Sequence, residues 1–404
     1  MGSTHRRRGL HFVEANHSLW AMADRETKAR QRRVLILTAS LGAGHKAAAG
    51  ALAHALQAAK PAPELRIIDA LDYAHRFFRF YYAGLFVAGM TRLSRLWGWG
   101  FDLADGPHVP GRTNLEKLRL WTERRALRRL AEEVTAWRPD VVLNTHFVSA
   151  PLVGRLIAHG SLQAVHMVVG TDHNMHRWWF AENVDQWFMP DEASRARARR
   201  WGVPNDRIAV TGIPIHPKWT QRLDRRKVCA DWSLPAETPI VIVTGGTEFT
   251  CGPVVALAVG ILRACPRSHV VVLAGRNKRL LAELSRLEAA GRRLSPVSFT
   301  DRVHELVEVA SLIVTKPGGI TTAECCAKGT PMVLLPPVPG QEAANARHLC
   351  EHGAAVTPGG PAKVVGAVQR LLDNPGELAR MSDCARGLYR PATSTIVGAI
   401  CRAL

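Results

Sequence analysis

Short apolar runs recur along the chain and alternate with longer stretches in which apolar residues follow helical spacing. The first two runs, residues 34–38 and 65–69, flank an alanine-rich helical stretch at 47–59. Apolar runs without apolar–polar alternation are typical of parallel strands that helices cover on both faces. The same pattern predicts further strands at 141–144, 165–169, 208–211, 240–244, 270–274, 312–315 and 332–335.

The series of strands restarts after about residue 212, where two prolines lead into a polar stretch. We therefore predict an α/β protein with two doubly wound domains. The expected parts are a basic extension (1–32), an N-terminal acceptor domain (33–212), a linker (213–236), a C-terminal donor domain (237–385) and a final helix (386–404) that packs back on the first domain.

Composition and charge narrow the class of protein. Hydrophobic residues are 47% and charged residues 22% of the 404, as in soluble globular proteins. The net charge of +19 favours an anionic partner, either nucleic acid, acidic lipid or a phosphorylated substrate, unless it only reflects a general use of arginine. The eight cysteines form no C-x-x-C pair, which indicates a reducing compartment. No apolar run approaches the roughly 20 residues of a membrane-spanning helix, and Arg6–Arg8 precede no apolar core of an export signal.

A glycine loop, Gly42-Ala-Gly44-His45, lies between the first predicted strand and its helix. It matches a dinucleotide-binding fingerprint loosely, and it lacks the Lys-Ser/Thr pair of a phosphate-binding P-loop. A histidine at this place faces the crevice at the carboxyl edge of the sheet, where it could act as a general base. The alternative is a structural residue that begins the helix.

Residues 76–101 combine aromatic and basic side chains, with no acidic residue inside the segment. Such a segment suits an element that lies on a membrane surface, a groove for nucleic acid, or an ordinary packed helical pair. The candidate membrane and acceptor residues are Arg76, Arg79, Tyr82, Phe86, Arg92, Arg95, Trp97 and Trp99.

A third cluster follows the strand at 165–169 and contains Asp172, His173 and His176. Asp172 is the expected acid/base group or orienter of a histidine. His173 and His176 could share a metal ion, but no third ligand is evident, so we expect no metal here. The chain also lacks the D-x-D triplet that usually holds a divalent cation on a nucleotide-sugar.

The most specific motif follows the strand at 312–315, where Lys316-Pro-Gly318-Gly319 leads into a helix. The glycines allow close backbone approach, and the helix N-terminus offers free N–H groups to an anion. Glu324, one turn into the helix, suits the hydroxyls of a ribose. A second glycine nest at 245–247 and the polar loop at 340–345 complete a site for a nucleoside diphosphate.

Together these motifs resemble the monogalactosyldiacylglycerol synthase and processive diacylglycerol glucosyltransferase family. The resemblance covers about residues 33–385 and extends, more distantly, to the peptidoglycan N-acetylglucosaminyltransferase that acts on a lipid-linked muramoyl peptide. It implies the GT-B fold, two Rossmann-like domains facing a cleft. It also implies inverting transfer from a UDP-sugar to diacylglycerol without metal or other cofactor, monotopic binding to the anionic inner face of the cytoplasmic membrane, and no nucleic-acid partner.

The resemblance also assigns roles to residues. His45 corresponds to the family's proposed base and Asp172 to the aspartate of the Thr-Asp segment. The implied donor-binding residues are Gly246, Thr247, Phe299, Gly318, Gly319, Ile320, Thr321, Glu324, Gln341, Glu342 and Asn345. Three alternatives stay open: an N-acetylglucosamine transferase with another lipid-linked acceptor, a UDP-sugar epimerase of the same fold, and a non-catalytic module that binds lipid or nucleic acid.

Overall fold

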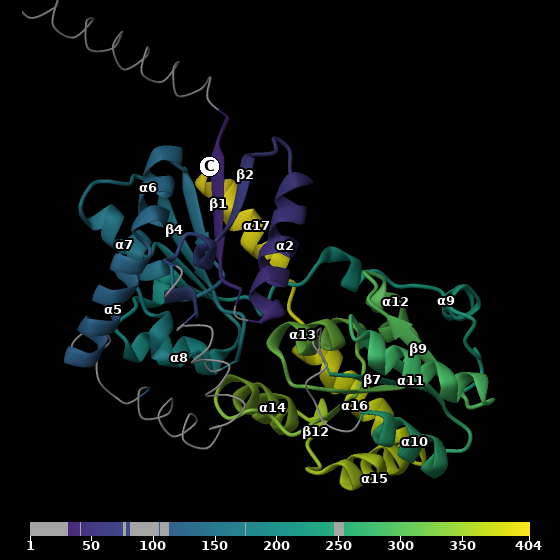
Figure 1. Cartoon of the computed structure of the whole chain (residues 1–404). Coiled ribbons are helices and arrows are strands. Elements are labelled where there is room, and N and C mark those ends of the chain that lie inside the picture. Colours follow the sequence, from purple (N-terminus) through teal and green to yellow (C-terminus); the bar gives the residue numbers. More distant parts are fainter. Residues whose placement is uncertain are drawn as a thin grey trace, which may run out of the picture.

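The computed structural model describes residues 31–40, 42–75, 78–80, 105, 113–173, 175–245 and 254–404. These residues form two halves, each built on a six-stranded parallel sheet with helices around it (Figure 1). The predicted α/β class with two doubly wound sheets is therefore confirmed.

The N-terminal sheet has the strand order β2-β1-β3-β4-β5-β6. Because the order changes direction between β1 and β3, the loops that follow these two strands leave a crevice at the carboxyl edge. The strands are β1 (Arg33–Thr38), β2 (Glu64–Asp69), β3 (Val141–Asn144), β4 (Val165–Val169), β5 (Gln186–Met189) and β6 (Ile208–Val210). The helices of this half are α2 (Ala43–Gln57), α5 (Asn114–Ala126), α6 (Arg128–Trp137), α7 (Ala150–Ala158) and α8 (Glu192–Arg200).

The C-terminal sheet has the order β12-β11-β10-β7-β8-β9, with the change of direction between β7 and β10. Its strands are β7 (Ile240–Thr244), β8 (His269–Gly275), β9 (Leu294–Ser298), β10 (Leu312–Thr315), β11 (Met332–Leu334) and β12 (Ala355–Val356). Its helices are α10 (Val254–Ala264), α11 (Lys278–Ala289), α12 (Val303–Val309), α13 (Gly319–Lys328), α14 (Gln341–Glu351), α15 (Pro361–Leu372) and α16 (Pro375–Leu388). The ends of β7 and β10, and with them the motif residues Lys316–Gly319, thus lie at the second crevice.

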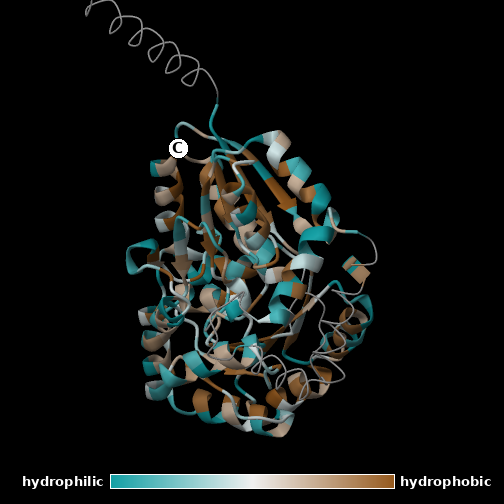
Figure 2. Cartoon of the chain, turned by 90° about the vertical axis from the view of Figure 1, so that its left-hand side faces the viewer, coloured by the Kyte–Doolittle hydropathy of each residue, from teal (hydrophilic) through white to brown (hydrophobic). Residues whose placement is uncertain are grey.

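The strands of both sheets consist mainly of buried apolar residues. Every residue of β3 and β10 is buried. Figure 2 shows mainly brown, apolar strands, whereas the helices around them mix teal and brown segments. Each fully buried Val, Leu or Ile contributes about 1.5–3 kcal/mol. The rigid sheets hold the loops at their carboxyl edges in fixed positions.

The chain passes between the halves twice. After β6, the stretch expected as a linker contains the short helix η4 (Pro217–Thr220) and α9 (Arg225–Asp231), and Trp219 and Val228 are buried in the C-terminal core. The last helix, α17 (Ala392–Ala403), returns to the first half beside α2 (Figure 1). There Ile396 and Ile400 pack in one cluster with residues of β1 and α2.

Several predicted site residues lie outside the described residues: Arg76, Tyr82, Phe86, Arg92, Arg95, Trp97, Trp99, Gly246 and Thr247. Of the aromatic and basic segment, the structure places Arg79, which forms an exposed ion pair of 3.3 Å with Asp72. Among the helices that are described, none has the combined length and apolar character needed to cross a bilayer.

Candidate active site

His45 lies in the first turn of α2, directly after the glycine loop. Gly42 has a φ of +87°, which side-chain-bearing residues rarely adopt, and this turn brings the helix start to the crevice. The His45 Nδ1 atom lies 3.0 Å from the Thr145 carbonyl oxygen and 2.8 Å from the Thr171 hydroxyl oxygen. Because a carbonyl can only accept, Nδ1 carries the proton and Nε2 keeps its lone pair.

Burial lowers the pKa of His45, while the nearby Asp172 carboxylate and the Thr145 carbonyl oppose that shift. The imidazole is therefore neutral near pH 7, which is the state that can accept a proton. A second histidine, His146, packs edge-on against His45 with ring centroids 4.6 Å apart. The sequence analysis missed His146 and Thr145, although both directly follow β3 and so lie at the crevice.

Asp172 is held by a residue of the other half. The Asn345 side-chain amide donates to Asp172 Oδ1 at 3.0 Å and to the Pro317 carbonyl at 2.9 Å. Its oxygen accepts from the backbone N–H of His173 at 2.8 Å. Asn345 is fully buried, and both polar atoms of its amide are engaged with protein groups. The expected contact with the donor stays a prediction, which these hydrogen bonds do not favour.

Gly319 begins α13 at the contact between the halves. A Cβ atom there would lie 2.1 Å from the Thr171 carbonyl oxygen, whereas one at Gly318 would have nothing within 4 Å. Gly319 therefore permits close approach of the other half of the protein, and Gly318 keeps the open space expected of a ligand-facing position. Ile320 packs with Ala48 of α2, so the helix that carries His45 directly contacts the donor-motif helix.

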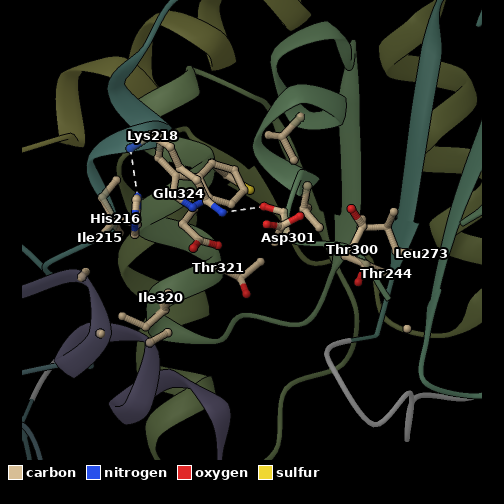
Figure 3. A pocket seen from close by; sticks show the side chains of 18 of the residues that line it. Ile215, His216, Lys218, Thr244, Leu273, Thr300, Asp301, Ile320, Thr321 and Glu324 are labelled. Atoms are coloured by element: carbon tan, nitrogen blue, oxygen red, sulfur yellow. Dashed lines mark hydrogen bonds between the residues drawn. The ribbon is translucent and has the colours of Figure 1, made fainter. Parts of the chain in front are cut away.

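A cavity of about 650 Å³ lies between α2 and the C-terminal sheet, within the usual size range of ligand pockets (Figure 3). In Figure 3 Ile320, Thr321 and Glu324 project from α13, and His216 and Lys218 come from the stretch after β6. The residues with polar or aromatic groups in its lining are His54, His216, Lys218, Trp219, Thr244, Ser298, Phe299, Thr300, Asp301, Thr321 and Glu324.

Glu324 and Phe299 are equipped for a ligand in this cavity. Burial raises the pKa of Glu324 to about 8, and Lys218 opposes the shift. No hydrogen bond or ion pair to the Glu324 carboxyl occurs within the part of the chain that the structure describes. Phe299 is 53% exposed, and the Arg276 guanidinium lies 4.4 Å from its ring centre. A carboxyl without a partner among the described residues and a half-exposed aromatic ring are the kinds of group that the sequence analysis expected for a ribose and a uracil.

The polar residues expected in a loop at 340–345 instead form the start of α14, apart from this cavity. Gln341 and Glu342 do not line it. Glu342 Oε2 accepts from the Val338 N–H at 2.9 Å and thereby stabilises the loop. Gln341 makes no side-chain hydrogen bond to any described residue. Of the three residues Gln341, Glu342 and Asn345, Gln341 is therefore the one whose side chain has both polar atoms available to a ligand.

His173 and His176 do not converge on one point. His173 Nδ1 pairs with Asp191 Oδ2 at 2.6 Å, whereas His176 Nδ1 accepts from the Trp178 N–H at 3.1 Å. The shared metal site considered for these two histidines is therefore absent.

Comparison with known proteins agrees with this arrangement. A family model described as monogalactosyldiacylglycerol (MGDG) synthase matches residues 45–215, and one described as the glycosyltransferase family 28 C-terminal domain matches residues 240–393. These two matches and the relatives below identify the chain as a UDP-glycosyltransferase. A processive diacylglycerol beta-glucosyltransferase of Bacillus cytotoxicus is 29% identical to it over 363 residues, 89% of this chain and 90% of the relative. The corresponding protein of Bacillus mycoides is 28% identical over 365 residues, with the same coverage.

Solved structures support the fold of this glycosyltransferase. The S. aureus MnaA–UDP structure has a TM-score of 0.56 at 16% identity, and covers 92% of this chain and 96% of that one. The Acinetobacter baumannii MurG structure has a TM-score of 0.55 at 15% identity, with coverages of 92% and 99%. At this identity the likeness concerns the fold alone. It confirms the predicted GT-B arrangement of two Rossmann-like domains.

Proposed function

We propose that this UDP-glycosyltransferase transfers a hexose to the free hydroxyl of diacylglycerol, with inversion at the anomeric carbon. The enzyme class follows from the family, and the acceptor is the one that the names of the two Bacillus relatives state. The names of the relatives state a glucosyl transfer and the matched family model a galactosyl product, so the proposed sugar is glucose or galactose.

One observation carries the proposal: α2 holds His45 at its start and also lines the donor cavity. Ala47, Gly50, Ala51 and His54 of this helix face the cavity that contains Phe299 and Glu324. A base on such a helix lies next to a nucleotide bound on the opposite wall. In this arrangement His45 Nε2 accepts the proton of the lipid hydroxyl, whose oxygen attacks the anomeric carbon from the face opposite UDP.

The departing diphosphate is stabilised by the N-terminus of α13 and by Thr321. Unpaired N–H groups and the positive end of the helix dipole replace the cation that other glycosyltransferases place there. Asp172, near enough to raise the pKa of His45, stabilises the imidazolium that forms. We infer that the reaction needs no metal ion, because no carboxylate pair follows β7 or β10 in the sequence.

His45→Ala tests the proposed base. It should lower kcat by roughly 10²–10⁴-fold, the range for loss of a general base. UDP affinity, measured by calorimetry, should stay unchanged because His45 is not part of the cavity lining. His159→Ala, which removes an exposed histidine on the first half, is the matched control.

Incubation of the wild-type enzyme with each UDP-sugar, with and without diacylglycerol, separates transfer from epimerisation. A new glycolipid in the mass spectrum supports the proposal. Conversion of one UDP-sugar into another without lipid supports the epimerase alternative instead. A near-normal kcat in His45→Ala would show that His45 is not the base and only helps to form the start of α2.

A further inference from the structure

Three side chains with metal-binding atoms meet where the two halves touch, outside the donor cavity. They are His173 and Asp191 of the first half and His348 of the second. One ligand atom from each can be chosen so that all lie within 4.8 Å of one another. Figure 1 shows the two helices concerned, α8 and α14, near each other across the boundary.

The local structure holds each group in place. Asp191 caps α8, where its Oδ1 accepts from the Ser194 N–H at 2.6 Å, so that Oδ2 is directed at His173 Nδ1, also at 2.6 Å. The His173 ring stacks on His348 with centroids 4.0 Å apart. Asn345, one turn before His348 on α14, binds the His173 backbone N–H at 2.8 Å. One face of α14 therefore fixes His348 against the Asp191–His173 pair.

The donor set is that of a transition metal. Two imidazoles and a carboxylate are ligands that Zn²⁺ accepts, with water in the remaining position. Within the described residues, no hydrogen bond reaches the ring nitrogens of His348. A second histidine, His352, directly follows α14 and lies beside His348 with ring centroids 4.4 Å apart.

The space next to these three side chains is large enough for a cation with bound water, and the charged residues of its lining are mainly acidic. A cavity of about 250 Å³ adjoins the three residues. Its lining also contains two carboxylates, Glu192 and Glu351, and one guanidinium, Arg390. The acidic side chains outnumber the basic one, which favours a bound cation.

We propose that His173, Asp191 and His348 form a site for a divalent transition metal such as Zn²⁺ that joins the two halves of the molecule. None of the three lines the donor cavity, so the metal takes no part in binding the diphosphate. A bound ion replaces the hydrogen bond between His173 and Asp191 and holds the halves in this relative position.

Calorimetric titration of the full chain with Zn²⁺ tests the site without reference to activity. The expected result is one ion per chain. His348→Gln and Asp191→Asn should each weaken the affinity at least about tenfold, and His159→Gln should not. Asn can still cap α8, and His348 is half-buried, so both variants should fold, which thermal unfolding checks.

Co²⁺ gives an independent signature, because a four-coordinate nitrogen and oxygen site absorbs in the visible range. This absorption should be present in the wild type and absent in His348→Gln. If the wild type binds neither ion, or if His348→Gln binds Zn²⁺ as tightly as the wild type, the proposal is wrong. UDP calorimetry on the same samples reports the donor site separately, so failure of one proposal is distinct from failure of the other.

Discussion

His45 owes its predicted reactivity to a carbonyl group 100 residues away in the sequence. The glycine loop identified the histidine as a candidate, but its tautomer depends on the Thr145 carbonyl, which only the fold brings within 3.0 Å. For Asn345, in contrast, the fold does not favour the role expected from the sequence. Its motif suggested a ligand contact, but the folded chain uses every polar atom of the amide within the protein.

Glu324 supports a prediction at the scale of one residue. Burial raises its pKa to about 8, so the carboxyl is mostly protonated at pH 7 before UDP binds. Ribose hydroxyls that donate to this group favour the carboxylate, so UDP binding should release a proton. The affinity for UDP should then rise with pH up to about 8, by up to about tenfold per pH unit.

Calorimetry between about pH 6 and pH 8 measures this dependence. Glu324→Gln is the matched control, because it leaves the ionisation of the diphosphate unchanged while it removes the titrating carboxyl. Its pH dependence should be smaller, and Glu324→Ala should weaken UDP binding by about 1.5–3 kcal/mol at pH 8. Equal pH profiles for the wild type and Glu324→Gln would remove Glu324 from the nucleoside site.

At the scale of elements, the apolar pattern predicted nine strands within one or two residues of their observed bounds. The apolar pattern did not predict three strands, β5, β9 and β12. β9 and β12 are the edges of the second sheet; β9 contains a proline, and β12 has only two residues. β5 is an inner strand, but its residues, Gln186–Met189, begin with a polar side chain and include none of the β-branched residues that mark the other strands.

The start of α13 gives a prediction about two neighbouring glycines. Gly319→Ala places a Cβ atom against the Thr171 carbonyl, which should separate the halves and lower the free energy of unfolding by about 1–3 kcal/mol. Gly318→Ala meets no protein atom and should cost less than about 1 kcal/mol, as for a changed helix cap.

Thermal unfolding and UDP calorimetry together distinguish the two positions. Gly318→Ala should weaken UDP binding, since its open space is expected to hold the ligand, while it leaves the melting temperature nearly unchanged. If both variants melt at the same temperature, then the close contact between α13 and the Thr171–Asp172 segment does not stabilise the molecule.

At the scale of the whole molecule, the net charge of +19 and the segment 76–101 predict reversible binding to anionic membranes. Each arginine that reaches an anionic surface contributes about 1 kcal/mol. Vesicles with phosphatidylglycerol should therefore bind the protein at low salt, and phosphatidylcholine vesicles should bind it much less. Replacement of Arg76, Arg79, Arg92 and Arg95 by Gln should reduce this difference, with Arg79 contributing least because Asp72 already pairs with it.

The control for membrane binding is a second quadruple variant with the same change in net charge. Arg263, Arg267, Arg279 and Arg292 are exposed on the C-terminal half, and their replacement by Gln should leave the vesicle preference nearly intact. Equal losses in the two variants would indicate that total charge, rather than the segment 76–101, attracts the membrane.

The most direct test of the central claim is the structure of the product formed in EDTA. The purified full chain is incubated with UDP-glucose or UDP-galactose and diacylglycerol vesicles, and the lipid is examined by mass spectrometry and NMR. UDP-hexoses carry an α linkage, so transfer by a single displacement assisted by His45 predicts a β-hexosyl diacylglycerol, formed about as fast in EDTA as with Mg²⁺. An α-linked glycolipid, or turnover that stops in EDTA and returns with Mg²⁺ or Mn²⁺, would contradict the mechanism, and the absence of any glycolipid would contradict the function.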